Sequence, residues 1–159
     1  MVVPMARGER GSVYLGLIFL VAILGTGLAA VGPLVQVSMQ REREADLLSI
    51  GDEFRRAILT YYESSPGGNK RYPRTLEDLL EDRRHPVMRR HLRRIHRDPW
   101  SGEPRWGLVE AEDGGFKGVY SLAELTPLKH AGFPSRYEAF AQASRYSDWR
   151  FEYAPPSLR

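Results

Sequence analysis

Cysteine is absent from this chain of 159 residues. Disulfide bridges, cysteine-ligated zinc sites and thiol catalysis are therefore excluded together. Charge is missing from one long stretch, because no charged residue lies between Arg10 and Arg41. Charged residues nevertheless make up 27% of the sequence, so the rest of the chain is dense in charge. The mean hydropathy of −0.42 excludes a polytopic membrane protein.

The uncharged stretch is long enough to cross a membrane as a helix. Val13–Val37 holds 25 uncharged residues, which as a helix would extend about 37 Å at about 1.5 Å per residue. A bilayer core is about 30 Å thick, so the length predicts one membrane pass. Arg7 and Arg10 precede it, which favours a cytoplasmic N-terminus and a head on the outer side. An ordinary signal peptide cut near Ala30 and a plain membrane anchor remain open alternatives.

The apolar stretch continues into an amphipathic pattern. Apolar residues follow at steps of three and four, namely Leu47, Ile50, Phe54, Ile58 and Tyr61. This spacing predicts one continuous helix over about 13–62, apolar all round in its first half and on one face in its second. Pro33 lacks a backbone donor and predicts a kink. A helix of this length is longer than a small domain needs for folding, so a further role is expected for it.

The remainder predicts an α+β head. Thr75 followed by acids predicts a capped short helix, and Met88, Leu92 and Ile95 predict another with arginines on its solvent face. A turn at 113–115 between 105–109 and 116–121 predicts a β-hairpin, and alternation over 149–153 predicts a last strand. Residues 122–146 are expected to form a long loop with a helical turn. The fold class expected is α+β, with a three-stranded antiparallel sheet against the long helix.

These features resemble type IV pilins and the pseudopilins of type II secretion. The leader ends in Gly11, and Pro33 is the 22nd residue counted from Ser12, where that family places its kinking proline. Tyr72–Leu79 resembles the start of the second helix in the major pseudopilins, and Asp98–Trp106 resembles their aspartate-proline-tryptophan-glycine approach to the sheet. The resemblance implies a pilin-like fold.

The same resemblance implies a processing site and partners. A prepilin peptidase would cut between Gly11 and Ser12 and methylate the new N-terminus. Other partners implied are further pseudopilin subunits through the N-terminal helix, an inner-membrane assembly platform and membrane lipid. Ser12 and Gly16 stand where the family has phenylalanine and glutamate. This departure favours a minor or atypical subunit over an ordinary one.

The expected organisation has four parts. Residues 1–11 form the leader, 12–39 the transmembrane and polymerisation helix, 40–63 its amphipathic continuation and 64–159 a periplasmic head. The expected location is the bacterial inner membrane, crossed once with the N-terminus cytoplasmic, and a fibre after assembly. The expected function is that of a non-catalytic subunit of a type II secretion pseudopilus or a type IV pilus-like fibre that assists protein export.

No enzyme, cofactor or metal site is expected. His130, Ser144 and Asp148 supply hydrolase residue types without a glycine-flanked serine turn. Asp148 alone does not make a calcium site. The glycine pairs lie in turn contexts and form no phosphate-binding loop.

A basic block is the remaining candidate site. Residues 83–97 hold seven arginines, three histidines and no acid. Arg89, Arg90, Arg93 and Arg94 are the candidate partner patch, for which a solvated face, an acidic protein partner and DNA all stay open. No aromatic residue is interleaved for base stacking, so a nucleic-acid partner is not the favoured one. A DNA-binding minor pilin for uptake and a periplasmic protein with an ordinary signal peptide are the alternative functions.

Overall fold

The computed structural model describes the backbone of residues 9–155 and the side chains of residues 14–23 and 36–155. The chain divides into two compact units, Met1–Gln40 and Arg41–Arg159. The second unit combines helices with a small sheet, so the expected α+β class with a three-stranded antiparallel sheet is confirmed. Its elements after the long helix are η1 (Pro66–Gly68), α2 (Glu77–Leu80), β1 (Gly107–Glu110), β2 (Phe116–Tyr120), η2 (Ser135–Gln142), η3 (Tyr146–Asp148) and β3 (Phe151–Glu152).

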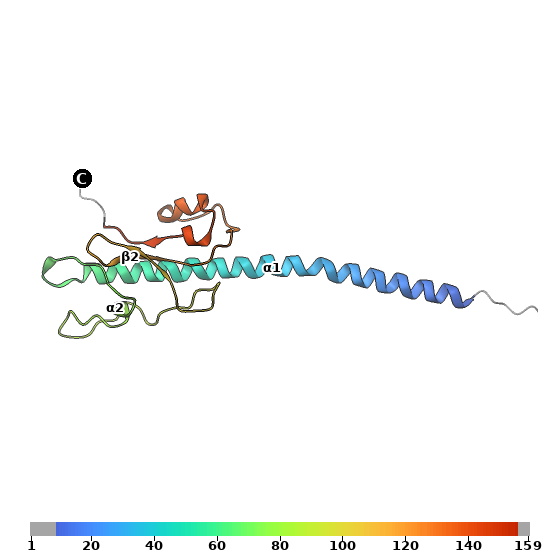
Figure 1. Ribbon diagram of the computed structural model, residues 1–159, viewed down its shortest axis with the longest axis horizontal. Helices are drawn as coiled ribbons and strands as arrows, with labels where there is room; N and C mark the ends of the chain where they lie inside the picture. Colours follow the sequence, from blue (N-terminus) through green and yellow to red (C-terminus); the bar gives the residue numbers. More distant parts are fainter. Residues whose placement is uncertain (1–8, 156–159) are drawn as a thin grey trace, which may run out of the picture. The chain divides into compact units, whose positions relative to one another are not determined.

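The longest element is α1, which runs from Glu9 to Glu63 without interruption (Figure 1). This confirms the predicted continuous helix over 13–62. The helix ends in a turn where Gly67 and Gly68 adopt positive φ angles of 70° and 74°, a conformation that favours glycine. The Lys70 ammonium donates to the carbonyl oxygen of Glu63 at 2.7 Å, where a cation also complements the helix dipole.

The amphipathic half of α1 forms the spine of the second unit. Its fully or nearly buried apolar side chains are Leu47, Phe54, Ala57, Ile58 and Tyr61, and Ile50 is partly buried against the same core. In Figure 1 the sheet lies on one side of this part of α1 and α2 on the other. Gly51 permits the closest approach, because a Cβ built there would lie 2.4 Å from the ring of Phe151.

The sheet has the order β1-β2-β3, and both pairs are antiparallel. The hairpin turn predicted at 113–115 is confirmed, with Gly114 at a φ of +79°. Within and on either side of β3, Trp149, Phe151 and Tyr153 are buried, whereas the two residues between them are exposed. This alternation is what the sequence predicted, since successive side chains of a strand point to opposite faces. The long loop before it contains η2, as expected.

The Asp98 motif forms a tight turn that leads into the sheet. The buried Asp98 carboxylate accepts hydrogen bonds from the Ser121 hydroxyl at 2.6 Å and from the Trp100 backbone N–H at 2.8 Å. The Gly102 N–H donates to the Asp98 carbonyl at 2.8 Å, and Gly102 has a φ of +71°. One carboxylate therefore ties the turn to the chain that follows β2.

Two predictions of local structure are wrong. Residues 83–97 contain no helix; Leu92 is buried as expected, but Met88 is 50% exposed. The physical reason is a β-bridge between Asp82 and Arg89, which takes up the backbone groups that a helix would use. Thr75 does not cap α2 either. The Asp78 carboxylate instead accepts the backbone N–H groups of Arg74 and Thr75, each at 2.9 Å.

The predicted location in the inner membrane is contradicted. Across the residues that the structure describes, no helix has the length and apolar character needed to cross a membrane. Such a crossing takes about 20 consecutive, predominantly apolar residues, and this criterion is not met there. The assignment of a transmembrane half to α1, with a cytoplasmic N-terminus and a periplasmic head, is therefore withdrawn.

Candidate functional site

An exposed apolar surface covers part of α1. Every large apolar side chain described between residues 14 and 23 is 48–66% exposed, namely Tyr14, Leu15, Leu17, Ile18, Phe19, Leu20, Val21 and Ile23. A Cβ added at Gly16 would meet nothing within 4 Å. Helices that are apolar all round are normally buried, and exposed patches of this kind mark interaction sites. We call residues 14–23 the apolar segment.

The predicted processing residues lie close to the apolar segment in the chain. Gly11 and Ser12 have helical backbone near the start of α1, and the backbone is also helical at Pro33. The surroundings of these three positions lie outside what the structure describes, and so do residues 1–8 of the predicted leader. The cut site and the kink therefore stay predictions.

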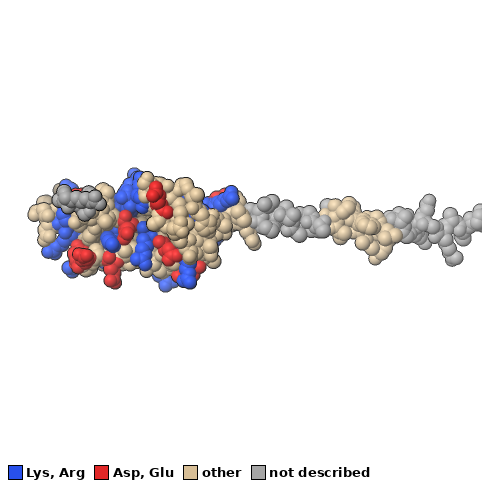
Figure 2. Space-filling model, turned by 90° about the horizontal axis from the view of Figure 1, so that it is seen from above, with Lys and Arg blue, Asp and Glu red and all other residues tan. Residues whose placement is uncertain are grey.

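The four arginines of the predicted patch are all exposed. Within the described part of the chain, no carboxylate forms an ion pair with Arg89, Arg90, Arg93 or Arg94. These side chains face solvent, as expected, but they do not lie on the predicted helix. Figure 2 shows that elsewhere on the second unit basic and acidic side chains are interspersed. The patch therefore gathers four exposed arginines, close together in the chain, that have no ion-pair partner among the described residues.

Two arginines of the patch, Arg89 and Arg90, belong to a hairpin-like arm, residues 79–92, which we call the basic arm, and Arg93 and Arg94 follow this arm directly in the chain. Its two legs pair through the Asp82 N–H to the Arg89 carbonyl at 2.9 Å and the Arg89 N–H to the Asp82 carbonyl at 3.2 Å. At its base, Leu79 and Leu92 are 0% and 2% exposed. The Leu92 N–H donates to the Leu79 carbonyl at 2.9 Å. The arm therefore combines an apolar base with a closed backbone loop.

Asp82 holds the basic arm to the end of α1. Its fully buried carboxylate accepts the Arg84 guanidinium in a bidentate pair, with Nε–Oδ1 and Nη2–Oδ2 distances of 2.8 Å. The same guanidinium donates to the Tyr61 carbonyl at 2.8 Å and the Ser65 hydroxyl at 2.9 Å, and lies 3.5 Å from the centre of the Tyr61 ring. Burial opposes ionisation of Asp82, but hydrogen bonds from Arg84 and His91 outweigh it and hold the pKa of Asp82 well below its usual range.

Two histidines complete this polar cluster. His91 Nε2 lies 3.2 Å from Asp82 Oδ2 and its Nδ1 lies 3.0 Å from the Thr60 hydroxyl. Burial lowers the pKa of His91 in spite of the neighbouring carboxylate. His85 Nε2 is buried without a hydrogen-bond partner, 3.7 Å from the Asp82 carboxylate. These contacts lock α1 to the arm, and they leave Asp82 fully occupied.

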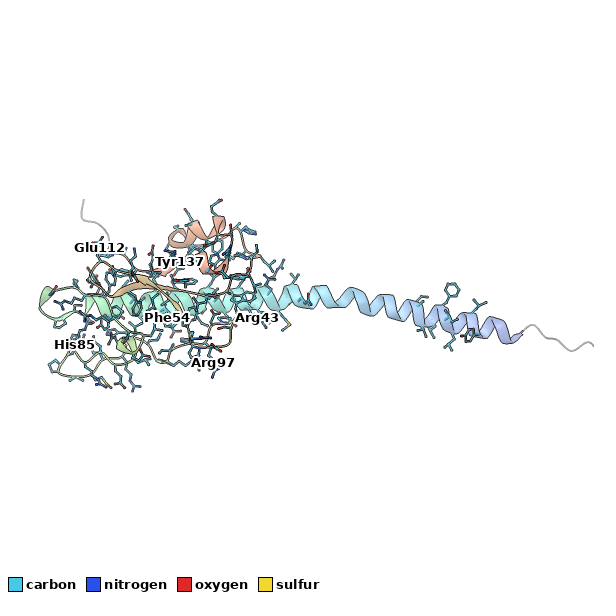
Figure 3. All side chains as sticks on the ribbon, viewed as in Figure 1. Arg43, Phe54, His85, Arg97, Glu112 and Tyr137 are labelled. Atoms are coloured by element: carbon cyan, nitrogen blue, oxygen red, sulfur yellow. The ribbon has the colours of Figure 1, made fainter. Side chains whose placement is uncertain are left out.

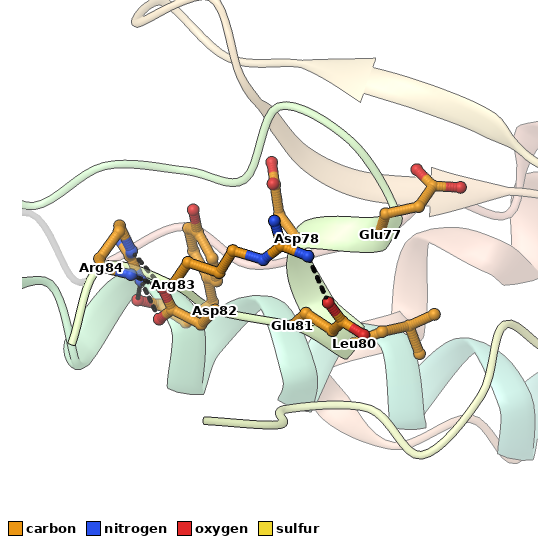
Figure 4. Close-up of a pocket in the computed structure, with 8 residues that line it drawn as sticks. Glu77, Asp78, Leu80, Glu81, Asp82, Arg83 and Arg84 are labelled. Carbon is orange, nitrogen blue, oxygen red and sulfur yellow. Dashed lines mark hydrogen bonds and ion pairs between the residues drawn. The ribbon is translucent and has the colours of Figure 1, made fainter. Parts of the chain in front are cut away.

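A depression of about 660 Å³ borders this cluster, lined by Tyr61, Glu77, Asp78, Leu80, Glu81, Asp82, Arg83 and Arg84. Dashed lines in Figure 4 join two pairs of these residues: Arg83 pairs with Glu81 at 2.8 Å, and Arg84 pairs with Asp82. Two further acids, Glu77 and Asp78, line the depression outside these ion pairs, and Asp78 accepts the backbone N–H groups of Arg74 and Thr75. The described residues contain no group of three or more metal-ligating side chains that could hold an ion.

Of the three hydrolase residue types, Ser144 and Asp148 lie in one turn, and no hydrogen bond or ion pair within the described residues joins His130 to either of them. The Asp148 carboxylate accepts the backbone N–H groups of Ser144 and Arg145 at 3.1 and 3.0 Å, which is a turn-capping role. Sequence reasoning missed the Asp82–Arg84 pair. The only signal was an acid placed directly before a run of arginines.

Comparison with known proteins adds no relative: no model of a known family, no curated protein and no solved structure gave a significant match.

Proposed function

We propose that this protein is a structural, non-catalytic subunit of a pseudopilus or type IV pilus-like fibre, a minor or atypical pseudopilin that assists protein export. The single observation that carries the proposal is the exposed apolar segment of α1, continuous in the chain with a helix half packed into a small α+β unit. The pilin-like character of the fold is part of the same proposal.

The physical argument is about what covers the apolar segment. Burial of its eight large apolar side chains away from water is favourable by about 25 cal/mol for each Å² buried. Equivalent helices of neighbouring subunits provide a matching apolar surface, and their packing would bury all faces of the segment at once. Gly16 would let a neighbouring helix approach closely, as small residues do. Assembly of a fibre core satisfies this requirement.

The internal pairing of charges supports a non-catalytic role. Four of the residues that line the depression beside α2 form two ion pairs, Arg83 with Glu81 and Arg84 with Asp82. A catalytic acid, base or nucleophile ordinarily has a perturbed pKa and access to a substrate. Asp82 has the first property but not the second, because its side chain is fully buried against Arg84.

Mass spectrometry of the chain purified from its native cells tests the processing that this function implies. The proposal expects a mature N-terminus at Ser12. Replacing Gly11→Trp should block the cut and leave the longer chain, while Gly16→Ala should be processed normally. An N-terminus at Ala30, an uncut wild-type chain, or normal processing of the Gly11 variant would contradict the assigned site.

A further inference from the structure

We propose that the basic arm is a docking element for a protein partner whose surface offers an apolar pocket rimmed by acidic side chains. The inference goes beyond assembly through α1, because it concerns a different surface on the second unit. It starts from the tip of the arm, where Val87 and Met88 are 77% and 50% exposed.

The composition of the tip is unusual for a surface loop. Two adjacent apolar side chains, Val87 and Met88, are exposed at the tip of a segment that holds four arginines and two histidines between residues 83 and 92. Arg89 and Arg90 follow directly, and both are exposed without an ion-pair partner among the described residues. An apolar anchor surrounded by cations matches an apolar pocket with an anionic rim, since the charges steer the encounter and the anchor fills the pocket.

The frame behind the tip is rigid. The Asp82–Arg89 bridge closes the loop, and the Asp82–Arg84 pair fixes its first leg to Tyr61 of α1. Among the arginines of the arm, Arg84 forms an ion pair with Asp82, and Arg83 forms one with Glu81. A preformed loop loses little conformational entropy on binding. Arg83 and Arg84 therefore take part in ion pairs within the fold, whereas Arg89 and Arg90 are free to contact a partner.

Charge complementarity selects a protein over a nucleic acid. Arg89, Arg90, Arg93 and Arg94 would serve either partner, but exposed Val87 and Met88 have no use against phosphates. Stacking platforms for bases are aromatic, and no aromatic residue lies within 83–97. In Figure 3 the arm, marked by His85, lies on the side of α1 opposite Glu112 and Tyr137. The sheet face therefore stays clear of a partner bound there.

Fluorescence anisotropy with labelled probes tests the proposal on the full chain. The probes are a random glutamate–tyrosine copolymer, polyglutamate of equal length, a 20-base-pair DNA duplex and phosphatidylglycerol vesicles. The expected result is that the copolymer binds at least tenfold more tightly than polyglutamate and more tightly than DNA or vesicles. Val87→Ser combined with Met88→Ser should remove this tenfold advantage while leaving polyglutamate binding unchanged.

A charge variant and its matched control complete the test. Arg89→Glu with Arg90→Glu should abolish binding of both acidic probes, whereas Arg71→Glu with Arg74→Glu, which reverses two exposed arginines outside the arm, should not. The proposal would be overturned if the two arginine-pair variants lost binding of the acidic probes equally, or if DNA or vesicles bound more tightly than the copolymer. It would also be overturned if the Val87 and Met88 variant bound the copolymer as tightly as the wild type. Unchanged melting temperatures exclude misfolding. Cross-linking through α1 reads out fibre assembly separately, so failure of one proposal is distinguishable from failure of the other.

Discussion

Among single residues, Asp82 bears the most interactions. Its buried carboxylate receives the Arg84 guanidinium, the Arg84 backbone N–H at 3.0 Å and His91. Hydrogen bonds to a charged group contribute about 1.5–3 kcal/mol each, and an unsatisfied partner left behind costs more than the bond was worth. The attachment of the basic arm to α1 therefore depends on one side chain.

Asp82→Asn tests this dependence. The amide keeps the shape but removes the charge that Arg84 faces, so the free energy of unfolding should fall by about 1.5–3 kcal/mol, measured by urea denaturation. Glu81→Gln is the matched control, because it removes the acid of the neighbouring exposed pair with Arg83; its midpoint should not move. An Asp82 variant as stable as the wild type would refute the role given to the carboxylate.

His91 predicts a pH dependence of stability at mildly acidic pH. Burial lowers its pKa below the usual value of about 6.5. The unfolded chain therefore binds the proton more readily, and the stability contributed by neutral His91 is present above about pH 6.5 and lost as the pH falls below it. The melting temperature should decline as the pH is lowered from 7.5 to 5, and this decline should be less steep in the His91→Gln variant. Parallel slopes in the two proteins would contradict this assignment.

Between elements, α1 packs tightly against β3 at Gly51, which faces the Phe151 ring. Alanine normally favours a helix over glycine by about 1 kcal/mol. At Gly51, however, the added Cβ would overlap the Phe151 ring, and overpacking of a core costs about 1–3 kcal/mol. Gly51→Ala should therefore lower the melting temperature, whereas Gly16→Ala, with open space around it, should not. A stabilising effect at Gly51 would show that the helix and sheet are not packed as described.

The apolar segment of α1 carries a prediction about assembly. Leu20→Asp places a charge on a side chain that is 54% exposed in the single chain but buried in the proposed fibre, where an unpaired charge is costly. Sedimentation should show loss of large assemblies. Leu122→Asp changes a leucine that is 52% exposed on the second unit, and assembly should persist. Equal behaviour of the two variants would count against packing through α1.

The elements with strong periodicity were the ones that the sequence predicted. The steps of three and four in α1 and the alternation in β3 each reflect one buried face, so the pattern itself carries the information. The basic arm was not predictable in this way. Met88, Leu92 and Ile95 have helical spacing, but the backbone pairs of Asp82 with Arg89 and of Leu79 with Leu92 close a hairpin-like loop instead.

At the scale of the whole molecule, several tyrosines resist ionisation. Burial and a hydrogen bond to the Glu63 carboxylate raise the pKa of Tyr153 to about 12. Burial and the Asp52 carboxylate also raise the pKa of Tyr137. Both rings tie the C-terminal part of the chain to α1.

This predicts a loss of stability at alkaline pH. A raised pKa in the folded state means that the contribution is complete below the unfolded value of about 10 and declines as the pH rises through the folded value. Melting temperatures should therefore fall between pH 10 and pH 12. Tyr153→Phe should start lower at neutral pH and fall less steeply. An unchanged slope would exclude Tyr153 as a contributor.

The proposed function rests on what covers the apolar segment, and the cysteine-free sequence makes this directly measurable. Leu17→Cys combined with Phe19→Cys places two thiols on opposite sides of α1, since residues two apart differ by about 200° around a helix. On oxidation in native cells, the account predicts a ladder of covalent multimers. A matched pair on the second unit, Arg71→Cys with Glu112→Cys, should give none. Absence of the ladder from the helix pair, or an equal ladder from both pairs, would contradict subunit packing through α1.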